Sequence, residues 1–268
     1  MEKIFERLEK ARKTSPLVHH ITNYVTVENC ANITKCFGGS PVMADAHEEV
    51  CDMVQLADSL VLNIGTLNNV QVESMKLAGK TANKKGIPVV LDVCGAGATK
   101  YRNETCKELM SSFKVSVVKG NLSEIATIAG LNVKTKGVDS GSVSADKYEL
   151  AKTLANTIKA VVVITGEEDV VSNGKDTYSI KNGVNIMGRI VGTGCMATSV
   201  MAIFCAIEKD YALACASALV CYEIAAENAE KTSDGPGTFV SNFFDKILML
   251  SEISVNKMKK ISKITLQD

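Results

Sequence analysis

The stretch VGTGCMATS, Val191–Ser199, places two glycines directly before a long helical run, in a chain that otherwise alternates strands and helices. Gly192 and Gly194 let the backbone turn tightly and expose its N–H groups. The positive dipole end of the following helix points at the same place, so we expect this turn to bind an anion such as phosphate. The alternative is a glycine turn that only ends a connection.

The same letters also satisfy the dinucleotide fingerprint G-x-G-x-x-A, with Ala197 in the last place. That fingerprint belongs to the first βαβ unit of a fold, with an acidic residue on the next strand about 20 residues further on. Here the next segment is another helix. The context therefore argues against a dinucleotide site.

Upstream of this turn, short β-branched apolar runs alternate with longer amphipathic runs. This pattern is typical of strands connected through helices in a mainly parallel sheet, and it predicts the α/β class. The expected strands are Leu17–Ile21, Leu60–Ile64, Val89–Val93, Val115–Lys119 and Val161–Thr165. The expected helices are Val25–Phe37, Val70–Lys85, Lys147–Lys159, Gly194–Ile207, Tyr211–Lys231 and Phe239–Leu250.

The segment Val170–Ile180 has Asn173-Gly174 at its centre, which predicts a β-hairpin that adds an antiparallel pair to the sheet. The length of 268 residues fits one domain over 1–268. We expect the basic tail, about 252–268, to be frayed.

Composition limits the classes of partner. Lys plus Arg and Asp plus Glu both number 30, and no basic run interleaves with aromatic residues, so a nucleic-acid binder is not expected. No apolar stretch approaches the ~20 residues that span a bilayer, so we expect no membrane segment and a cytoplasmic protein. The nine cysteines include no C-x-x-C pair, which argues against a disulfide framework or a zinc ribbon. His19 and His20 are neighbours on a predicted strand and would point to opposite faces, which argues against a shared metal.

Two acidic residues follow predicted strands, at the edge where open parallel sheets bind ligands. Asp92 ends the strand in LDVCGAGAT, and Glu124 lies in NLSE, after the strand SVVKG. Carboxylate oxygens are ligands that Mg²⁺ prefers. As alternatives, Asp92 only caps a turn, and Asn121 with Glu124 forms a capping box at a helix start.

Lys119 and Thr165 end two further predicted strands, where they would contact a phosphate and a nucleotide. An anion-binding turn, two carboxylates and a cation together suggest phosphoryl transfer, in which catalysis is largely positioning and charge stabilisation. The absence of G-x-x-x-x-G-K-[ST] excludes an ordinary P-loop.

Nine stretches between Pro16 and Phe239 carry a resemblance to a known family. They are PLVHHITNYVTVENCAN, GGSPVMADAHEEV, LVLNIGTL, LDVCGAGAT, KGNLSEI, KGVDSG, ITGEEDV, VGTGC and DGPGTF. With them the chain resembles the hydroxyethylthiazole kinases of thiamin salvage, in the ribokinase-like superfamily. The resemblance implies a three-layer α/β fold, with a mainly parallel central sheet and helices on both faces. It also implies ATP-dependent phosphorylation of the hydroxyl of 4-methyl-5-(2-hydroxyethyl)thiazole by a homotrimer with active sites between subunits, to which Val25–Met43 would contribute.

The resemblance also assigns roles to individual residues. The implied thiazole contacts are Met43, Gly192 and Asn23. The implied ATP contacts are Lys119 and Thr165. The implied ligands of Mg²⁺ and the phosphates are Asp92 and Glu124. The residues implied to lie beside the reacting hydroxyl are Cys195 and Gly194.

The chain departs from the family pattern at three positions. Lys119 stands where arginine is common, which keeps the charge but loses the bidentate fork. Val93 stands where a proline is common, and His20 is unusual in its motif. Many ribokinase-like enzymes place an aspartate base where this chain has Cys195, so we expect a poor or optional base. Three alternatives stay open: a kinase of another small alcohol, a cysteine hydrolase or acyltransferase, and a catalytically silent binding protein.

Overall fold

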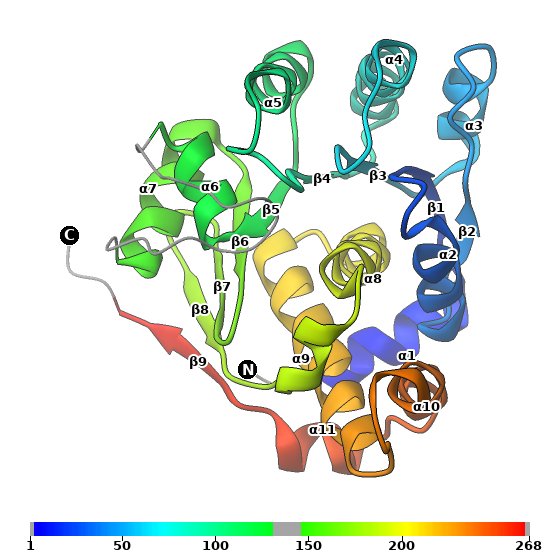
Figure 1. The fold of residues 1–268 in the computed structure, drawn as a ribbon, viewed down its shortest axis with the longest axis vertical. Coiled ribbons are helices and arrows are strands. Elements are labelled where there is room, and N and C mark those ends of the chain that lie inside the picture. The colour runs from blue at the N-terminus through cyan, green and yellow to red at the C-terminus, as the bar shows by residue number, and fades with distance from the viewer. Residues whose placement is uncertain (1–2, 131–145, 266–268) are drawn as a thin grey trace.

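The computed structural model describes residues 3–130 and 146–265, so the KGVDSG motif lies outside the described residues. Within them, one sheet has the strand order β2-β1-β3-β4-β5-β6-β7-β8-β9 (Figure 1). The strands are β1 Leu17–Ile21, β2 Ser40–Val42, β3 Ser59–Asn63, β4 Val89–Asp92, β5 Val117–Asn121, β6 Val161–Thr165, β7 Asp169–Ser172, β8 Thr177–Ile180 and β9 Ile261–Ile264. The neighbours from β2 to β6 pair in parallel, whereas β7, β8 and β9 are antiparallel additions.

Helices cover both faces of the sheet, which gives three layers (Figure 1). One face carries α3 Val50–Leu56, α4 Asn69–Lys85, α5 Lys100–Ser112, α6 Leu122–Ile128 and α7 Lys147–Ile158. The other carries α1 Ile4–Thr14, α2 Val27–Cys36, α8 Thr193–Ile207, α9 Tyr211–Glu230, α10 Pro236–Leu248 and α11 Glu252–Met258, and a 3-10 turn, η1 Asn185–Arg189, precedes α8. The expected three-layer α/β architecture is confirmed.

Strand side chains alternate between the two layers, as the pleat requires. On β3, Val61 packs in the core that contains α8 and α9, while Leu60 and Leu62 pack with α3 and α4. Both faces are therefore apolar, which explains the continuous apolar runs by which these strands are recognised in the sequence. The five predicted parallel strands and the hairpin are all present, with ends that differ by two residues or fewer.

The expectation of a frayed tail is wrong over most of its length. α11 is a regular helix, and β9 pairs with β8 from Ile261 opposite Ile180 to Ile264 opposite Thr177. Two of the basic side chains that suggested a solvated tail have acidic partners: Lys260 Nζ lies 3.0 Å from Glu227 Oε1 on α9, and Lys263 Nζ lies 2.7 Å from Asp176 Oδ1. The tail thus forms the edge strand of the sheet.

Candidate active site

The glycine turn before α8 has the geometry of an anion site. Gly192 is the N-cap of α8 with φ 96°, a left-handed conformation that favours glycine, and a Cβ there would lie 2.5 Å from Thr26 Cγ2. In the described part of the chain, no side chain accepts a hydrogen bond at this helix N-terminus. A hydrogen bond fixes the turn, because the Tyr222 hydroxyl donates to the Thr193 carbonyl at 2.8 Å. The N–H groups of the first helical turn can therefore face an anion.

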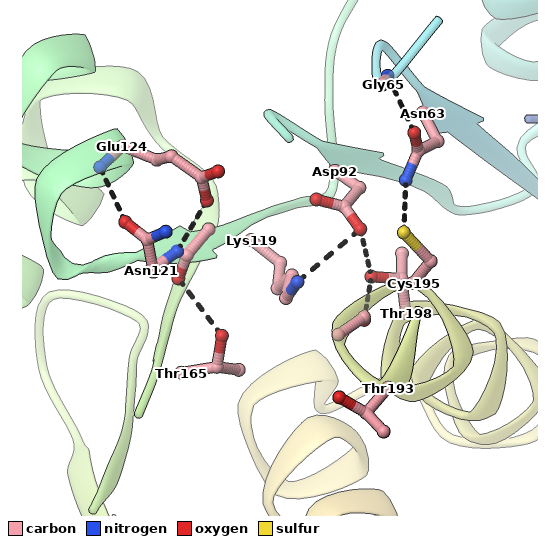
Figure 2. Close-up of polar contacts among 12 residues, drawn as sticks. Asn63, Gly65, Asp92, Lys119, Asn121, Glu124, Thr165, Thr193, Cys195 and Thr198 are labelled. Atoms are coloured by element: carbon pink, nitrogen blue, oxygen red, sulfur yellow. Dashed lines mark hydrogen bonds and ion pairs between the residues drawn. The ribbon is translucent and has the colours of Figure 1, made fainter. Parts of the chain in front are cut away.

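Asp92 and Lys119, at the ends of β4 and β5, form a buried ion pair beside this turn (Figure 2). Lys119 Nζ lies 3.4 Å from Asp92 Oδ2, which also accepts a hydrogen bond from Thr198 Oγ1 on α8 at 2.8 Å. Asp92 Oδ1 is buried without a hydrogen-bond partner among the described residues. Burial is the largest single influence and lowers the pKa of Lys119, but Asp92, Cys195, Glu124 and Cys94 together outweigh it, so the pKa is raised above its usual value. The lysine therefore stays cationic.

Gly194 faces the same lysine. A Cβ at Gly194 would lie 2.9 Å from Lys119 Nζ, so any other side chain would have to displace the ammonium group from the start of α8. The ammonium group and the helix N-terminus thus point at one position, as the sequence motifs predicted. This convergence places two sources of positive potential at one position.

Glu124 is placed differently from Asp92. Its Oε1 accepts the N–H of Gly95 and its Oε2 accepts the N–H of Asn121, each at 2.7 Å, while Asn121 Oδ1 accepts the N–H of Glu124. The capping box that the sequence left open is therefore present. Burial raises the pKa of Glu124, and the charge of Lys119 partly offsets this rise. Glu124 consequently ties the loop after β4 to the start of α6.

Cys195 lies in the first turn of α8 and is 8% exposed. Its sulfur accepts hydrogen bonds from Asn63 Nδ2 at 3.3 Å and from Asn23 Nδ2 at 3.4 Å. A hydrogen bond from the Cys94 thiol lowers the pKa of Cys195 to about 7, against the opposing effect of burial. The thiol is thus set up to act as an acceptor near neutral pH.

A cavity of about 1340 Å³ runs from the start of α8 along the ends of β5 and β6. Thr165 lines it, with its hydroxyl 3.4 Å from the Gly120 carbonyl. Gly194 also lines this cavity, while Asp169 and Glu223 form an acidic part of its wall. A long anionic ligand can therefore lie with one end at the helix start and the other beside Thr165.

The remaining predicted residues lie on the side of β1 and β2. Asn23 follows β1, is buried, and its side chain reaches Cys195. Met43 directly follows β2 and is half-buried, and it lines neither of the two cavities described in the structure. The structure thus brings Asn23 to the site, while Met43 follows β2 next to β1, where Val42 pairs with His19. His19 and His20 contact different elements, Ala44 and Ser199, as expected of two faces.

Sequence reasoning missed Asn63 and Arg102. Arg102, on α5, donates to the carbonyl oxygens of Ile64, Cys94 and Gly65 at 2.7–2.9 Å, and so joins the loops after β3 and β4. No local motif signals such contacts, because the acceptors are backbone atoms of distant segments. An asparagine that ends an apolar strand, as Asn63 does, was the one available cue.

Comparisons with known proteins agree with this geometry. A model of the hydroxyethylthiazole kinase family matches residues 8–253. The chain belongs to this family. A hydroxyethylthiazole kinase from Methanosarcina mazei is 49% identical over 257 residues, which cover 96% of this chain and 98% of that protein. The predicted family and its kinase class are confirmed.

A solved structure from the hydroxyethylthiazole kinase family also resembles this chain. The structure of a hydroxyethylthiazole kinase protein from Pyrococcus horikoshii is 36% identical, with a TM-score of 0.91 over 99% of this chain and 100% of that one. A ribokinase-like superfamily protein from Enterococcus faecalis is only 13% identical, with a TM-score of 0.62 over 90% and 93% of the two chains. The second match shows the fold alone, and agrees with the predicted three-layer α/β fold.

Proposed function

We propose that this chain transfers the γ-phosphoryl group of ATP to the hydroxyl of 4-methyl-5-(2-hydroxyethyl)thiazole, in thiamin salvage. Family membership and the kinase activity for which its relatives are named support the reaction. The observation that carries it is the convergence of Lys119, Gly194 and the N-terminus of α8 on one position next to Asp92. These groups are the ones that phosphoryl transfer needs.

In the proposed mechanism, charge stabilisation does most of the catalytic work. The first-turn N–H groups of α8 and the ammonium of Lys119 surround the phosphoryl group as negative charge spreads over its oxygens. These donors are fixed before the substrate arrives, because Tyr222 holds the turn and Asp92 holds the lysine. Reorganisation during the reaction is correspondingly small.

Cys195 would accept the proton of the attacking hydroxyl. Its sulfur is in the first turn of α8, and the two asparagine amides stabilise its acceptor state. Because the transition state of phosphoryl transfer is loose, the hydroxyl needs little deprotonation before attack. The cysteine therefore contributes less than the anion-binding turn.

We propose Mg²⁺ as the metal, held mainly by Asp92, with Glu124 beside it. The unpartnered, buried Oδ1 of Asp92 fits a hard cation, which binds through few carboxylates and keeps several waters. Within residues 3–130 and 146–265, no group of three or more His, Cys, Asp or Glu forms a complete metal cage. When bound, the ion would neutralise phosphate charge. Glu124, whose oxygens both accept backbone N–H groups, would act through water or through the loop.

The nucleotide would occupy the large cavity, with its phosphates at α8 and Lys119 and its remainder beside Thr165. The thiazole would lie on the other side of Cys195, near Asn23 and Gly192. We include Met43 in this pocket, because it directly follows β2, the strand that pairs in parallel with β1.

We propose a homotrimer in which a neighbouring subunit covers the alcohol side of the site. Exposed apolar side chains support this, because Tyr24, Val25 and Val191 are 78%, 58% and 72% exposed beside the turn and the end of β1. A cytoplasmic location is part of the proposal, because ATP is the co-substrate. In the described residues, no helix combines the length and apolar character needed to cross a membrane. Sedimentation of the active enzyme tests the assembly, and a fully active monomer would contradict it.

The decisive experiment mixes the protein with ATP, Mg²⁺ and a panel of small alcohols, and identifies the products by mass spectrometry. We expect the thiazole phosphate, with the other alcohols phosphorylated far more slowly. Preferred phosphorylation of another alcohol would support a different kinase of this fold. Absence of any phosphorylated product would refute the proposal.

A further inference from the structure

Two asparagine amides converge on the sulfur of Cys195 from separate strand ends. Asn63 ends β3 and Asn23 follows β1, and both side chains are buried. Their Nδ2 atoms lie 3.3 Å and 3.4 Å from Sγ, and Figure 2 shows the Asn63 contact. Neither contact serves to cap a helix or close a turn, so both are directed at the thiol itself.

The orientation of each amide is fixed by what its oxygen accepts. Asn63 Oδ1 accepts the N–H of Gly65 at 2.8 Å and Asn23 Nδ2 at 2.9 Å. Asn23 Oδ1 accepts both the N–H and the hydroxyl of Thr26 at 3.0 Å. Rotating either amide by half a turn would place an N–H group against another donor. Both residues must therefore present N–H groups to the sulfur.

We propose that Asn63, together with Asn23, is a positioning residue that holds the acceptor atom of residue 195 against the reacting hydroxyl. The pair forms a cradle of two donors, which favours an anionic acceptor over a neutral thiol because charge-assisted hydrogen bonds are the stronger ones. The effect on turnover rests on the proposed function, whereas the effect on the sulfur does not. Thr26 and Gly65 are the anchors of the cradle.

Other groups also act on this sulfur, so the test must change the cradle alone. The pKa of Cys195 also depends on Cys94, Asp92 and Lys119. The substitution Asn63→Asp leaves these groups in place and keeps an oxygen to accept the N–H of Gly65. It replaces the sulfur-facing donor by an acceptor and adds a carboxylate charge beside the sulfur, and both changes disfavour the thiolate. Asn256→Asp is the matched control, since it makes the same change at an exposed position on α11.

The first measurement is the rate of alkylation of Cys195 by iodoacetamide at one neutral pH, with the site located by mass spectrometry. Because the thiolate is the nucleophile, we expect Asn63→Asp to slow alkylation by about tenfold or more. The second measurement is steady-state kinetics. We expect kcat to fall by about tenfold while the KM for ATP changes by less than about twofold, because the cradle does not touch the nucleotide.

Alkylation or kcat at the parental level in Asn63→Asp would overturn the proposal, as would an equal loss in Asn256→Asp. Thermal unfolding verifies that each variant is folded. If Asn63→Asp does not fold, Asn23→Asp replaces it, because it keeps the acceptor for Thr26 and removes the other donor, with the same expected outcomes. Slower alkylation in a protein that phosphorylates no alcohol would support the cradle while refuting the proposed function.

Discussion

Asp92 and Glu124 are acidic residues at the ends of neighbouring parallel strands, yet their surroundings differ. Asp92 keeps one buried oxygen without a partner among the described residues, and its other oxygen contacts Lys119 and Thr198. Glu124 has both oxygens engaged by backbone N–H groups. The difference teaches that a carboxylate at a strand end is available for chemistry only where the backbone leaves it an open lone pair. We therefore assign charge stabilisation to Asp92 and loop architecture mainly to Glu124.

The largest effect is expected for Asp92→Asn. The substitution preserves shape but removes the charge that holds Lys119 and any bound cation, so kcat should fall by about 10³-fold, the upper range for loss of a preorganised electrostatic group. Steady-state kinetics with ATP and the thiazole alcohol measure this. The matched variant Thr198→Val removes only a hydrogen bond to Asp92 and should cost much less. Equal losses in the two variants would contradict the assignment.

The next effect is expected for Gly194→Leu. The new side chain would occupy the space of Lys119 Nζ, which lies 2.9 Å from the position of the first added carbon. We expect kcat to fall by about 10²-fold, with the fold retained, because α8 tolerates leucine. Circular dichroism checks the helix content. Gly237→Leu in the first turn of α10 is the control, since a Cβ there meets nothing within 4 Å and the residue lines neither cavity. A similar loss in that variant would remove the link to Lys119.

The substitution Glu124→Gln should lower the stability of the fold more clearly than it lowers turnover. The amide group keeps one acceptor and turns its NH₂ toward a backbone N–H, which leaves a buried donor unsatisfied and costs about 1–3 kcal/mol of stability. Turnover at saturating Mg²⁺ should fall less than in Asp92→Asn. Urea unfolding and kinetics measure the two effects. Unchanged stability combined with a turnover loss as large as that of Asp92→Asn would make Glu124 the primary metal ligand.

The smallest effects on kcat are expected for substitutions of Cys195. Neither Asp92 nor Glu124 forms a hydrogen bond with this residue in the described structure. Cys195→Ser should stay measurably active, and Cys195→Asp should be at least as active as the parent. Because the pKa of Cys195 lies at about 7, thiolate forms as pH rises through neutrality. Parental kcat should therefore rise between pH ~6 and ~8, by less than the ~10²-fold typical of a general base.

The pH profile of Cys195→Asp gives the comparison for this rise. An aspartate is ionised throughout the range, so its profile should be flat there. An identical rise in both variants would assign the titration to another group. Complete loss of activity in Cys195→Ser and Cys195→Asp, with the fold intact, would instead identify the thiol as an obligatory nucleophile.

The parallel strands were predictable because each is an apolar, β-branched run between breakers, and burial on both faces makes such runs continuous. β2 was not predicted, because Ser40–Val42 is short and contains a proline. β9 was mistaken for a solvated tail, because Lys260 before it and Lys263 within it find acidic partners only in the folded structure. Local pattern indicates the elements, whereas edge strands depend on distant partners.

The residues of the site also divide into those that local motifs indicate and those that depend on distant partners. Asp92, Lys119, Gly192 and Gly194 were predicted together because each follows a strand or precedes a helix in a recognisable motif. Of the two amide donors to Cys195, Asn63 was missed and Asn23 was named only as an implied thiazole contact, because their role arises where three separate chain segments meet. Spacing also suggested equal roles for the two carboxylates, and only the backbone hydrogen bonds of Glu124 distinguish them.

The contact between Thr26 and Gly192 joins the two halves of the site mechanically. Thr26 packs where a Cβ of Gly192 would lie, and its hydroxyl is bonded to Asn23. A ligand that orders the segment after β1 therefore also restrains the turn that precedes α8. Such coupling is reciprocal, so each substrate should bind more tightly in the presence of the other. Each substrate should also slow amide hydrogen exchange in the half of the site that binds the other substrate.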